Sequence, residues 1–323
     1  VVMGLRHFSK TYKPFMHPWA FELWEKHEDI HWTAKEASLN DDIIDWKRKL
    51  TPQEKNFIIN ILRLFTQSDV QVGQNYYDYL IPIFKNNEVR NMLGSFANRE
   101  ATHQTAYALL NDTLGLPDEE FHKFLEYKAM SDKIDFMADN NVDTDAGVAL
   151  ALAKSVFSEG VSLFSSFAML LQLQTVGKMK GMCTIVEWSI RDETMHVQGN
   201  SRLFREWCAE YPAIVTDELK SAIYRMAEDV VINEDKFIEV AYEDEYEFAN
   251  LSRDEVRTYI RYMADYRLKQ LGLKPIMGVA KNPIPTLDWL INGSSHDNFF
   301  EKRVTEYSVN GMEGDWNWKN NAS

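Results

Sequence analysis

The chain has 323 residues, 45% of them apolar, which is enough for a sizeable buried core in one large domain or two modest ones. Its net charge of −14 argues against nonspecific binding to nucleic acid, which relies on a basic surface. Two cysteines, Cys183 and Cys208, are too few for a disulfide framework or a zinc site, so a reducing, cytoplasmic compartment is expected.

The spacing of apolar residues predicts long helices and an all-α fold. Only 14 glycines and 9 prolines interrupt the chain, and no alternating pattern of any length predicts a strand. Thr51 and Glu54 form a capping box with a proline at the first helical position, and Ser252 opens a second one. The expected helices run from Thr51 towards Tyr77, from Glu88 to Leu114, from Pro117 to Met130, from Asp145 to Leu173, through Glu193 to Tyr211, from Asp217 to Tyr242 and from Ser252 to Leu271.

Two parts of the chain fall outside this helical pattern. The first fifty residues are aromatic and irregular, with three tryptophans spread among charged residues. After Pro283 the chain is polar and rich in Asn, Gly and Ser, which is typical of a loosely held end. We therefore expect one helical domain over residues 1–285, opening with an irregular segment, and a flexible tail over residues 286–323.

The most apolar segment runs from Val148 to Leu173 and is interrupted by Lys154 and Glu159. Because charged side chains are costly inside a lipid bilayer, this segment predicts a buried core helix and not a membrane span. No signal-peptide pattern opens the chain. We therefore expect neither a membrane nor a nucleic acid among its partners.

Two copies of the pattern Glu-x-x-His are the most informative feature of the chain. They are Glu100-Ala-Thr-His103 and Glu193-Thr-Met-His196, and each falls in a long helix-like segment. Residues three apart lie on one face of a helix, so each copy presents a carboxylate and an imidazole to a single point. One such pair alone is most often part of a solvated helix face. Two copies in one chain favour a binding site.

Two lone acids complete the pattern. Asp69 and Glu159 each fall in a strongly apolar stretch ahead of one Glu-x-x-His pair, in the order that a duplicated two-helix unit would give. Burying four carboxylates without a cation is prohibitively costly, whereas four acids and two imidazoles from four helices form the ligand set of a dinuclear metal centre. The predicted ligands are Asp69, Glu100, His103, Glu159, Glu193 and His196.

The ligand types narrow the choice of metal. Carboxylates and imidazoles without a thiolate favour iron or manganese over soft metals. Zinc also accepts such ligands, but structural zinc sites are usually mononuclear and four-coordinate. Glu100 and Glu193 are the predicted bridging carboxylates, and two ions held that close can jointly supply electrons for the reduction of O₂. A di-iron, a dimanganese and a mixed centre all stay open, because both metals accept the same hard ligands.

Tyr107 lies four residues after His103, on the same helical face and one turn from the predicted metals. A lone tyrosine at such a position is usually a core residue with its hydroxyl satisfied. Beside an oxidising dinuclear centre, however, a phenol is an oxidisable group. Leu163 and Phe167 follow Glu159 on one helical face and would supply the dry wall that a long-lived radical requires.

With these residues, the sequence resembles the small, radical-generating β subunit of class I ribonucleotide reductases. The matching residues, in type, order and approximate spacing, are Asp69, Glu100-x-x-His103 with Tyr107, Glu159, and Arg191-Asp192-Glu193-x-x-His196. The resemblance extends from about Trp19 to Tyr307. It implies a ferritin-like helical bundle in which each lone acid and the Glu-x-x-His pair that follows it bind one metal. It also implies that Tyr107 carries the radical.

The resemblance implies a path for the oxidising equivalent towards a cysteine of the catalytic α subunit. The path passes His103, Asp192 and Trp32 and ends at a tyrosine in the tail, Tyr307. Without the family, Trp32 would be a core anchor and Asp192 a hydrogen-bond partner of a ligand histidine. Tyr307 lies in a polar stretch without helical periodicity, which suits a segment that orders on docking.

By this resemblance the chain is the small subunit of ribonucleoside-diphosphate reductase, which makes deoxyribonucleotides only together with the large catalytic α subunit. Small subunits of the family are homodimers activated by an oxygen-derived oxidant, and a flavodoxin-like activase is a further partner that the resemblance leaves open. Nucleotide pockets belong to the α subunit, and no glycine-rich phosphate loop is present in this sequence. Tyr107 argues against the subclass that has phenylalanine at this position.

Two alternatives share the helical bundle. Di-iron oxygenases, oxidases and desaturases usually place Glu at the first ligand position and need no tail tyrosine, whereas this chain has Asp69 and Tyr307. Iron-storage proteins of the ferritin class are generally much shorter and assemble into cages. The oxygenase or oxidase is the nearer alternative.

Overall fold

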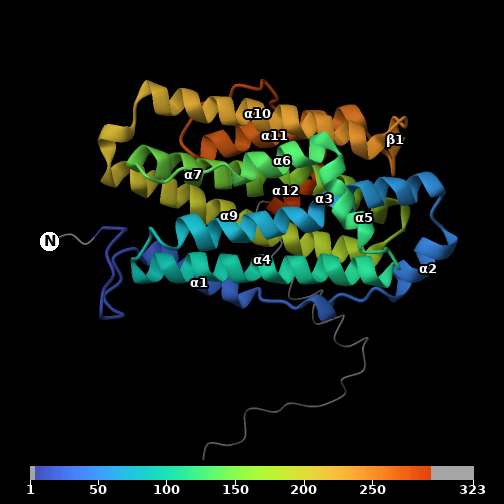
Figure 1. Ribbon diagram of the computed structural model, residues 1–323, viewed down its shortest axis with the longest axis horizontal. Coiled ribbons are helices and arrows are strands. Elements are labelled where there is room, and N and C mark those ends of the chain that lie inside the picture. The colour runs from blue at the N-terminus through green and yellow to red at the C-terminus, as the bar shows by residue number, and fades with distance from the viewer. Residues whose placement is uncertain (1–3, 292–323) are drawn as a thin grey trace, which may run out of the picture.

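The computed structural model describes residues 4–291, which form a bundle of helices (Figure 1). Within this range the chain is all-α apart from one short antiparallel hairpin of β1 (Glu247–Phe248) and β2 (Leu251–Ser252). The predicted all-α fold is therefore confirmed. The predicted tail beyond residue 291, Tyr307 included, lies outside the described residues.

The α-helices of residues 4–291 have the following bounds: α1 Pro18–Asp29, α2 Asn40–Arg48, α3 Pro52–Asn75, α4 Asn87–Thr113, α5 Glu119–His122, α6 Lys128–Ala138, α7 Asp145–Phe157, α8 Phe164–Leu171, α9 Lys180–Glu210, α10 Asp217–Tyr242, α11 Arg253–Gln270 and α12 Pro285–Ile291. Two π-helical segments continue α3 and α7, namely η2 (Tyr76–Leu80) and η4 (Ser158–Ser162). The 3₁₀ turns are η1 Ala34–Glu36, η3 Lys123–Glu126, η5 Gln172–Val176 and η6 Pro212–Ile214.

Side-chain caps mark the starts of several long helices. Thr51 Oγ1 accepts the backbone N–H of Glu54 at 3.1 Å, and Ser252 makes the equivalent bond at the start of α11, so both predicted capping boxes are present. Thr144 and Thr216 cap α7 and α10 in the same way. Each cap satisfies an N–H group that has no partner within its own helix.

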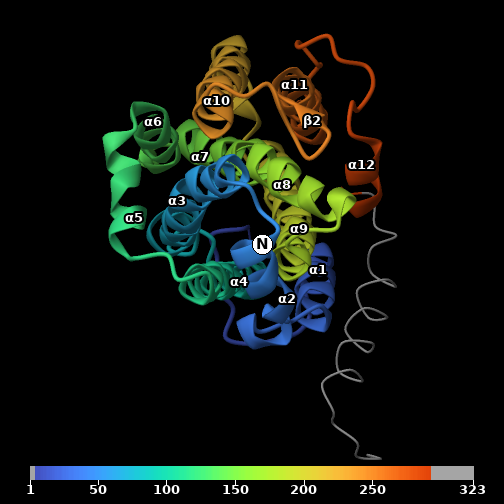
Figure 2. The ribbon, with the colours of Figure 1, turned by 90° about the vertical axis from the view of Figure 1, so that its right-hand side faces the viewer.

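Four helical units surround the centre of the molecule: α3, α4, α9 and the continuous α7–η4–α8 unit. Viewed end-on, these helices enclose a common interior (Figure 2). Helices α1 and α2 pack beside α4 and α9 on one side, while α10 and α11 cover α6, α7 and α8 on the opposite side. Because the four units turn apolar faces inward, a polar side chain placed in this interior is removed from water.

The first fifty residues are more helical than the sequence pattern predicts, since both α1 and α2 lie within them. Helix α2 is hard to predict because its acids Asp42 and Asp45 are buried instead of facing water. Asp42 accepts the backbone N–H groups of Gly181 and Met182 at 2.8 and 2.7 Å. An acid from a distant part of the chain therefore caps the start of α9, and no local pattern shows such a role.

The segment predicted as one helix from Pro117 to Met130 is broken. It contains α5 and η3, and the backbone of Tyr127 is extended (φ −96°, ψ 111°) before α6 begins. Arg63 of α3 donates to the Tyr127 hydroxyl at 3.0 Å and packs over its ring. Arg63 thus fixes Tyr127 at the break between η3 and α6, which the local periodicity does not predict.

A π-helical segment interrupts the predicted helix from Asp145 to Leu173. Segment η4 separates α7 from α8, and all of its residues are buried. The stretch Asp145–Val176 is long and apolar enough to cross a membrane, but its most apolar window is entirely buried within the protein. The stretch is therefore packed as a core helix. Single-turn π segments are frequent at functional sites.

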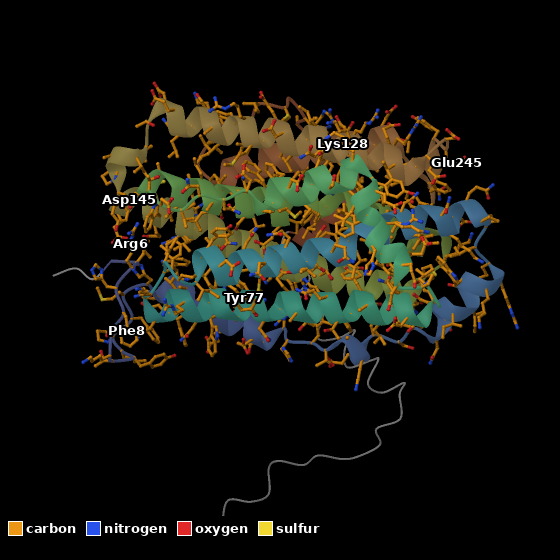
Figure 3. All side chains as sticks on the ribbon, viewed as in Figure 1. Arg6, Phe8, Tyr77, Lys128, Asp145 and Glu245 are labelled. Carbon is orange, nitrogen blue, oxygen red and sulfur yellow. The ribbon has the colours of Figure 1, made fainter. Side chains whose placement is uncertain are left out.

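Arg6 joins the N-terminal segment to the start of α7. Its guanidinium pairs with Asp145 at 2.6 Å (Figure 3). It also lies over the Trp207 ring, 4.7 Å from the centroid. The neighbouring Leu5 is buried, and its carbonyl accepts the backbone N–H of Asn86 at 3.1 Å. These contacts close one end of the bundle.

Candidate metal centre

The six predicted ligands converge in the interior of the bundle. Their elements are α3 for Asp69, α4 for Glu100 and His103, η4 for Glu159, and α9 for Glu193 and His196. None of the six side chains is more than 1% exposed. The i, i+3 spacing on α4 and α9 turns both members of each pair to the same face, as the sequence pattern indicates.

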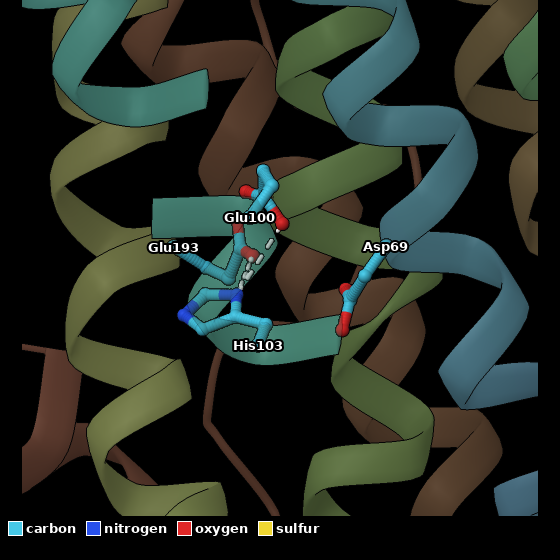
Figure 4. Close-up of side chains that lie close together, drawn as sticks. All are labelled: Asp69, Glu100, His103 and Glu193. Carbon is cyan, nitrogen blue, oxygen red and sulfur yellow. Dashed lines mark ion pairs between the residues drawn. The ribbon is translucent and has the colours of Figure 1, made fainter. Parts of the chain in front are cut away.

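One set of donor atoms gathers around His103. Asp69, Glu100, His103 and Glu193 each offer one atom, and these atoms lie within 4.8 Å of one another. His103 Nδ1 is 3.3 Å from Glu100 Oε2 and 3.3 Å from Glu193 Oε1. The two glutamates and the histidine point toward one another, and Asp69 reaches in from α3 (Figure 4).

A second set gathers around His196 and shares two members with the first. Glu100, Glu159, Glu193 and His196 also offer atoms within 4.8 Å of one another. His196 Nδ1 is 3.0 Å from Glu100 Oε1, 3.1 Å from Glu159 Oε1 and 3.4 Å from Glu193 Oε2. Glu100 and Glu193 therefore turn one oxygen towards each histidine, which is the arrangement of carboxylates that bridge two ions.

Several carboxylate oxygens of the cluster have no hydrogen-bond donor among residues 4–291: Asp69 Oδ2, both oxygens of Glu100 and both oxygens of Glu193. The histidine nitrogens approach these glutamates without hydrogen-bond geometry. A buried oxygen without a donor is costly, so the cluster fits cations that the oxygens coordinate. Oxygen and nitrogen donors without a thiolate suit iron or manganese.

Burial and mutual charge shift the pKa values within the cluster. Burial, followed by the charge of Glu100, raises the pKa of Asp69 well above its usual value, and burial raises that of Glu159 to about 8. Burial would also raise the pKa of Glu100, but the two histidines outweigh it and lower that pKa to about 2. Burial lowers the pKa values of His103 and His196, yet the carboxylates prevail and raise them. The centre of the cluster therefore favours positive charge.

A buried network holds the far side of the His103 ring. His103 Nε2 is 2.8 Å from Asp192 Oδ2, and the same oxygen accepts Trp32 Nε1 at 2.8 Å. Arg99 donates to the other oxygen of Asp192 at 2.5 Å, a contact that the sequence pattern does not indicate. Because Asp192 engages Nε2, Nδ1 of His103 is the nitrogen that faces the carboxylates. Trp32, Asp192 and His103 thus lie in one network.

His196 has a different partner behind it, which sequence reasoning missed. Its Nε2 is 3.0 Å from Nε2 of His27 on α1, and His27 Nδ1 is 3.2 Å from Ser95 Oγ. Burial lowers the pKa of His27 well below its usual value, so this ring is neutral. His27 shares the buried face of α1 with Ala20 and Leu23, and this i, i+3, i+7 spacing was the available signal.

Tyr76 and Asn200, also missed from the sequence, hold the Glu159 carboxyl group. The Tyr76 hydroxyl donates to it and lies 2.8 Å from Oε1 and 2.9 Å from Oε2. Asn200 Nδ2 lies 2.8 Å from the Tyr76 hydroxyl and 3.2 Å from Glu159 Oε2. Tyr76 follows Asp69 by two helical turns, so its position on the same face as a predicted ligand was a usable signal.

Tyr107 is fully buried and is held by one aromatic and one polar contact. Its hydroxyl is 2.9 Å from Ser189 Oγ, and Ser189 donates its own proton to the Ile185 carbonyl, so Tyr107 is the donor to Ser189. The Tyr107 ring packs edge-on against Phe65 at 4.5 Å between centroids, and Phe65 packs against Phe167 at 5.1 Å. Burial raises the pKa of Tyr107 well above its usual value, so the phenol keeps its proton.

The fold and this cluster define a helical bundle of the dinuclear-metal class, and comparison with known proteins identifies the family. Residues 9–283 match the family described as "Ribonucleotide reductase, small chain". The probable ribonucleoside-diphosphate reductase small subunit of Invertebrate iridescent virus 3 is 40% identical over 328 residues, covering 95% of this chain and 86% of the relative. The chain therefore belongs to the ribonucleotide reductase small-chain family. The general role of this family is to generate, at a dinuclear metal centre, the radical that the catalytic subunit uses.

Solved structures share the fold. Dimanganese(II)-NrdF from Streptococcus sanguinis superposes with a TM-score of 0.76 at 22% identity, covering 88% of this chain and 99% of its own. A ribonucleotide reductase homodimer from Saccharomyces cerevisiae gives a TM-score of 0.74 at 21% identity, covering 94% of this chain and 90% of its own. At these identities the likeness establishes the fold alone. Both the predicted ferritin-like bundle and the predicted family are confirmed.

Proposed function

We propose that the buried cluster binds two iron or manganese ions and generates the oxidising equivalent that ribonucleotide reduction requires. Asp69, Glu100 and His103 would hold one ion, and Glu159, Glu193 and His196 would hold the other. Glu100 and Glu193 each belong to both donor sets. The observation that carries the proposal is the orientation of Glu100 and Glu193. Each of them turns one carboxylate oxygen towards His103 and the other towards His196. Once activated by an oxygen-derived oxidant, the ions would supply the oxidising power.

The proposal includes both metals. The donor set suits iron and manganese equally, and the dimanganese state of the Streptococcus sanguinis protein supports manganese as one occupant. Deoxyribonucleotide formation after loading with each metal in turn distinguishes the two. If the two ions are manganese, we propose a flavodoxin-like activase as a further partner of this subunit.

Tyr107 is the proposed store of the oxidising equivalent. Its ring is buried against Phe65, and its hydroxyl bonds only to the neutral Ser189 among the described residues. Full burial of this kind separates a one-electron-oxidised phenol from reductants in water. These features support the role of Tyr107 independently of the metal that occupies the cluster.

The proposed path away from the centre begins at the far side of His103. Asp192 joins this ring to the Trp32 indole through contacts of 2.8 Å each. Trp32 is fully buried, and its ring lies 5.9 Å from His103 and 5.1 Å from Trp188 between centroids. The last residue of the proposed path, Tyr307, lies outside the described residues.

The proposed assembly is a homodimer that acts with the large catalytic subunit in the cytoplasm. The homodimer of the Saccharomyces cerevisiae relative supports the first part. Family membership supports the second, because the matched family is the small chain of ribonucleotide reductase. Two cysteines in 323 residues suit a reducing compartment.

Metal analysis joined to electron paramagnetic resonance (EPR) and turnover assays tests the proposal. The loaded, activated chain should hold two ions, show a tyrosyl signal that Tyr107→Phe abolishes, and support deoxyribonucleotide formation only with the large subunit. Tyr307→Phe should abolish turnover while metal content and radical stay unchanged. Full turnover by Tyr307→Phe would contradict the path, and product hydroxylation by this chain alone would indicate the oxygenase alternative.

A further inference from the structure

Two buried cations bond to the backbone of η4, the π-helical segment that carries Glu159. Arg267 of α11 donates from Nε to the Gly160 carbonyl at 3.0 Å. Lys133 of α6 donates from Nζ to the Ser162 carbonyl at 2.8 Å. Neither cation is more than 1% exposed. The proposed radical chemistry uses neither side chain, so their convergence on one short segment needs another explanation.

The π-helical geometry of η4 explains why it needs outside donors. A π turn adds one residue and disrupts the regular i→i−4 ladder, so backbone carbonyls require other partners. Each residue of a regular helix turns by about 100°, so removing the extra residue would redirect the side chains of the segment by about that angle. The direction in which Glu159 leaves the backbone therefore depends on the π form.

Arg267 fits closely against the segment. A Cβ at position 160 would lie 2.5 Å from Arg267 Nε, so this approach requires glycine. The guanidinium packs over the rings of Phe164 and Tyr266, at 5.0 and 5.3 Å from their centroids, and donates to Gln270 Oε1 at 3.0 Å. These contacts hold the side chain with Nε directed at the Gly160 carbonyl.

The Arg267 guanidinium is a buried cation. Burial lowers its pKa to about 10, and the neighbouring Tyr259 and Tyr266 act in the opposite direction more strongly than Glu193 does. Its Nη2 has no hydrogen-bond partner among the described residues. A buried cation in this state is costly. Its presence therefore indicates a role in the site, since an apolar side chain would fill the same space at lower cost.

Lys133, the second cation at η4, is anchored by residues of other helices. It pairs with Glu234 of α10 at 2.5 Å, and Ser165 of α8 donates to the other oxygen of Glu234. The ammonium group lies over the Phe237 ring, 4.2 Å from the centroid. Residues of α6, α8 and α10 thus meet at the C-terminal end of η4. A buried ion pair of this kind contributes little net stability, but it holds its members in one geometry.

We propose that Arg267 and the Lys133–Glu234 pair are positioning residues that hold η4 in its π form and thereby place the Glu159 carboxylate against His196. The inference rests on the proposed metal site. Both clamps bind backbone carbonyls of η4, the segment that carries Glu159, whereas Asp69, Glu100 and His103 stand on other helices. Losing a clamp should therefore weaken the ion at His196 and spare the ion at His103.

Manganese(II) titration of the full chain, followed by EPR, tests this. The variants are Arg267→Met, Arg267→Lys and the double variant Lys133→Met/Glu234→Gln, which removes both charges together so that no buried charge is left unpaired. Lys154→Met is the matched control, because Lys154 of α7 also donates to a backbone carbonyl, that of Asp139, outside η4.

Arg267→Met and the double variant should keep the first binding step and weaken the second by about 10–100-fold, the usual effect of losing a partner that orients a ligand. Their EPR signal should be that of isolated manganese at concentrations where the wild type shows a coupled pair. Arg267→Lys keeps a cation and should restore part of the second step, which a merely structural role would not require. Lys154→Met should match the wild type.

Circular dichroism and thermal melting establish which variants are folded, and if Arg267→Met does not fold, Arg267→Lys and the double variant carry the test. An unchanged second step in folded variants would overturn the inference and leave the proposed site intact. Failure of the wild type to bind two ions would instead overturn the proposed function.

Discussion

The two halves of the cluster have similar ligands and different supports. Each half contains a histidine backed by a buried partner, but the partner of His103 is the anionic Asp192 and that of His196 is the neutral His27. A carboxylate behind an imidazole raises its basicity and fixes its orientation more strongly than a neutral ring does. The duplicated motif therefore gives two similar ligand sets in two different environments.

This difference separates two tasks. The Asp192 side continues to Trp32 and is the proposed exit for the oxidising equivalent. The other side is devoted to holding Glu159, through Tyr76 and through the clamped π segment. Mutations in the two halves should therefore have different consequences, and the following predictions run from the largest expected effect to the smallest.

Removing a shared ligand should affect both halves. Glu193→Ala takes away one oxygen from each donor set, so we expect both metals to be lost. Metal content per chain after desalting measures the effect. Glu206→Ala is the control on the same helix, since Glu206 pairs only with Arg202 at the surface among the described residues. Full metal occupancy in Glu193→Ala would refute the shared role.

Removing the hydroxyl group of Tyr107 or of Tyr76 should affect the tyrosyl EPR signal differently. Tyr107→Phe should abolish the tyrosyl EPR signal and turnover while metal content stays at the wild-type value, because Tyr107 bonds to Ser189 and to no ligand. Tyr76→Phe should keep the tyrosyl signal, since Tyr76 serves the Glu159 carboxyl group. A tyrosyl signal that survives in Tyr107→Phe and disappears in Tyr76→Phe would reverse the assignment.

Replacing the buried partner of each histidine with a neutral amide side chain tests the asymmetry directly. Asp192→Asn should lower the affinity of the metal at His103 by about 10–100-fold. His27→Gln exchanges one neutral partner for another and should change the affinity at His196 by less than about tenfold. Stepwise manganese titration measures both. Equal losses in the two variants would show that the charge of Asp192 is unimportant.

The smallest effect is expected at the acceptor of the Tyr107 hydroxyl. Ser189→Ala leaves this buried donor without a partner, which should lower the free energy of unfolding by about 1–3 kcal/mol. Denaturant unfolding measures the change, and metal content should stay the same. Ser201→Ala is a control on the same helix, because Ser201 bonds only to the carbonyl of Gln198 among the described residues. An equal loss in both variants would mean that the Tyr107 contact adds nothing.

The sequence predicts much of this centre because its signals are local. The i, i+3 pairs place Glu100 with His103 and Glu193 with His196 on single helix faces whatever the rest of the chain does. The capping box at Thr51 works in the same way, since donor and acceptor lie within one turn. Such features depend on spacing alone.

The missed features depend on contacts between distant segments. Asp42 caps α9 from 139 residues away, and His27 meets His196 across 169 residues. The π form of η4 is held by Lys133 and Arg267 from two other helices. Periodicity within one segment carries no information on such partners, so a continuous helix was the natural expectation there.

EPR of the chain with two equivalents of manganese(II) tests the central claim, that Glu100 and Glu193 hold two ions side by side. The account predicts that the resolved hyperfine signal of isolated manganese disappears as the second equivalent binds and gives way to the broad signal of a coupled pair. A resolved hyperfine signal that grows in proportion to bound manganese up to the second equivalent would show that the ions lie apart, and would contradict the account.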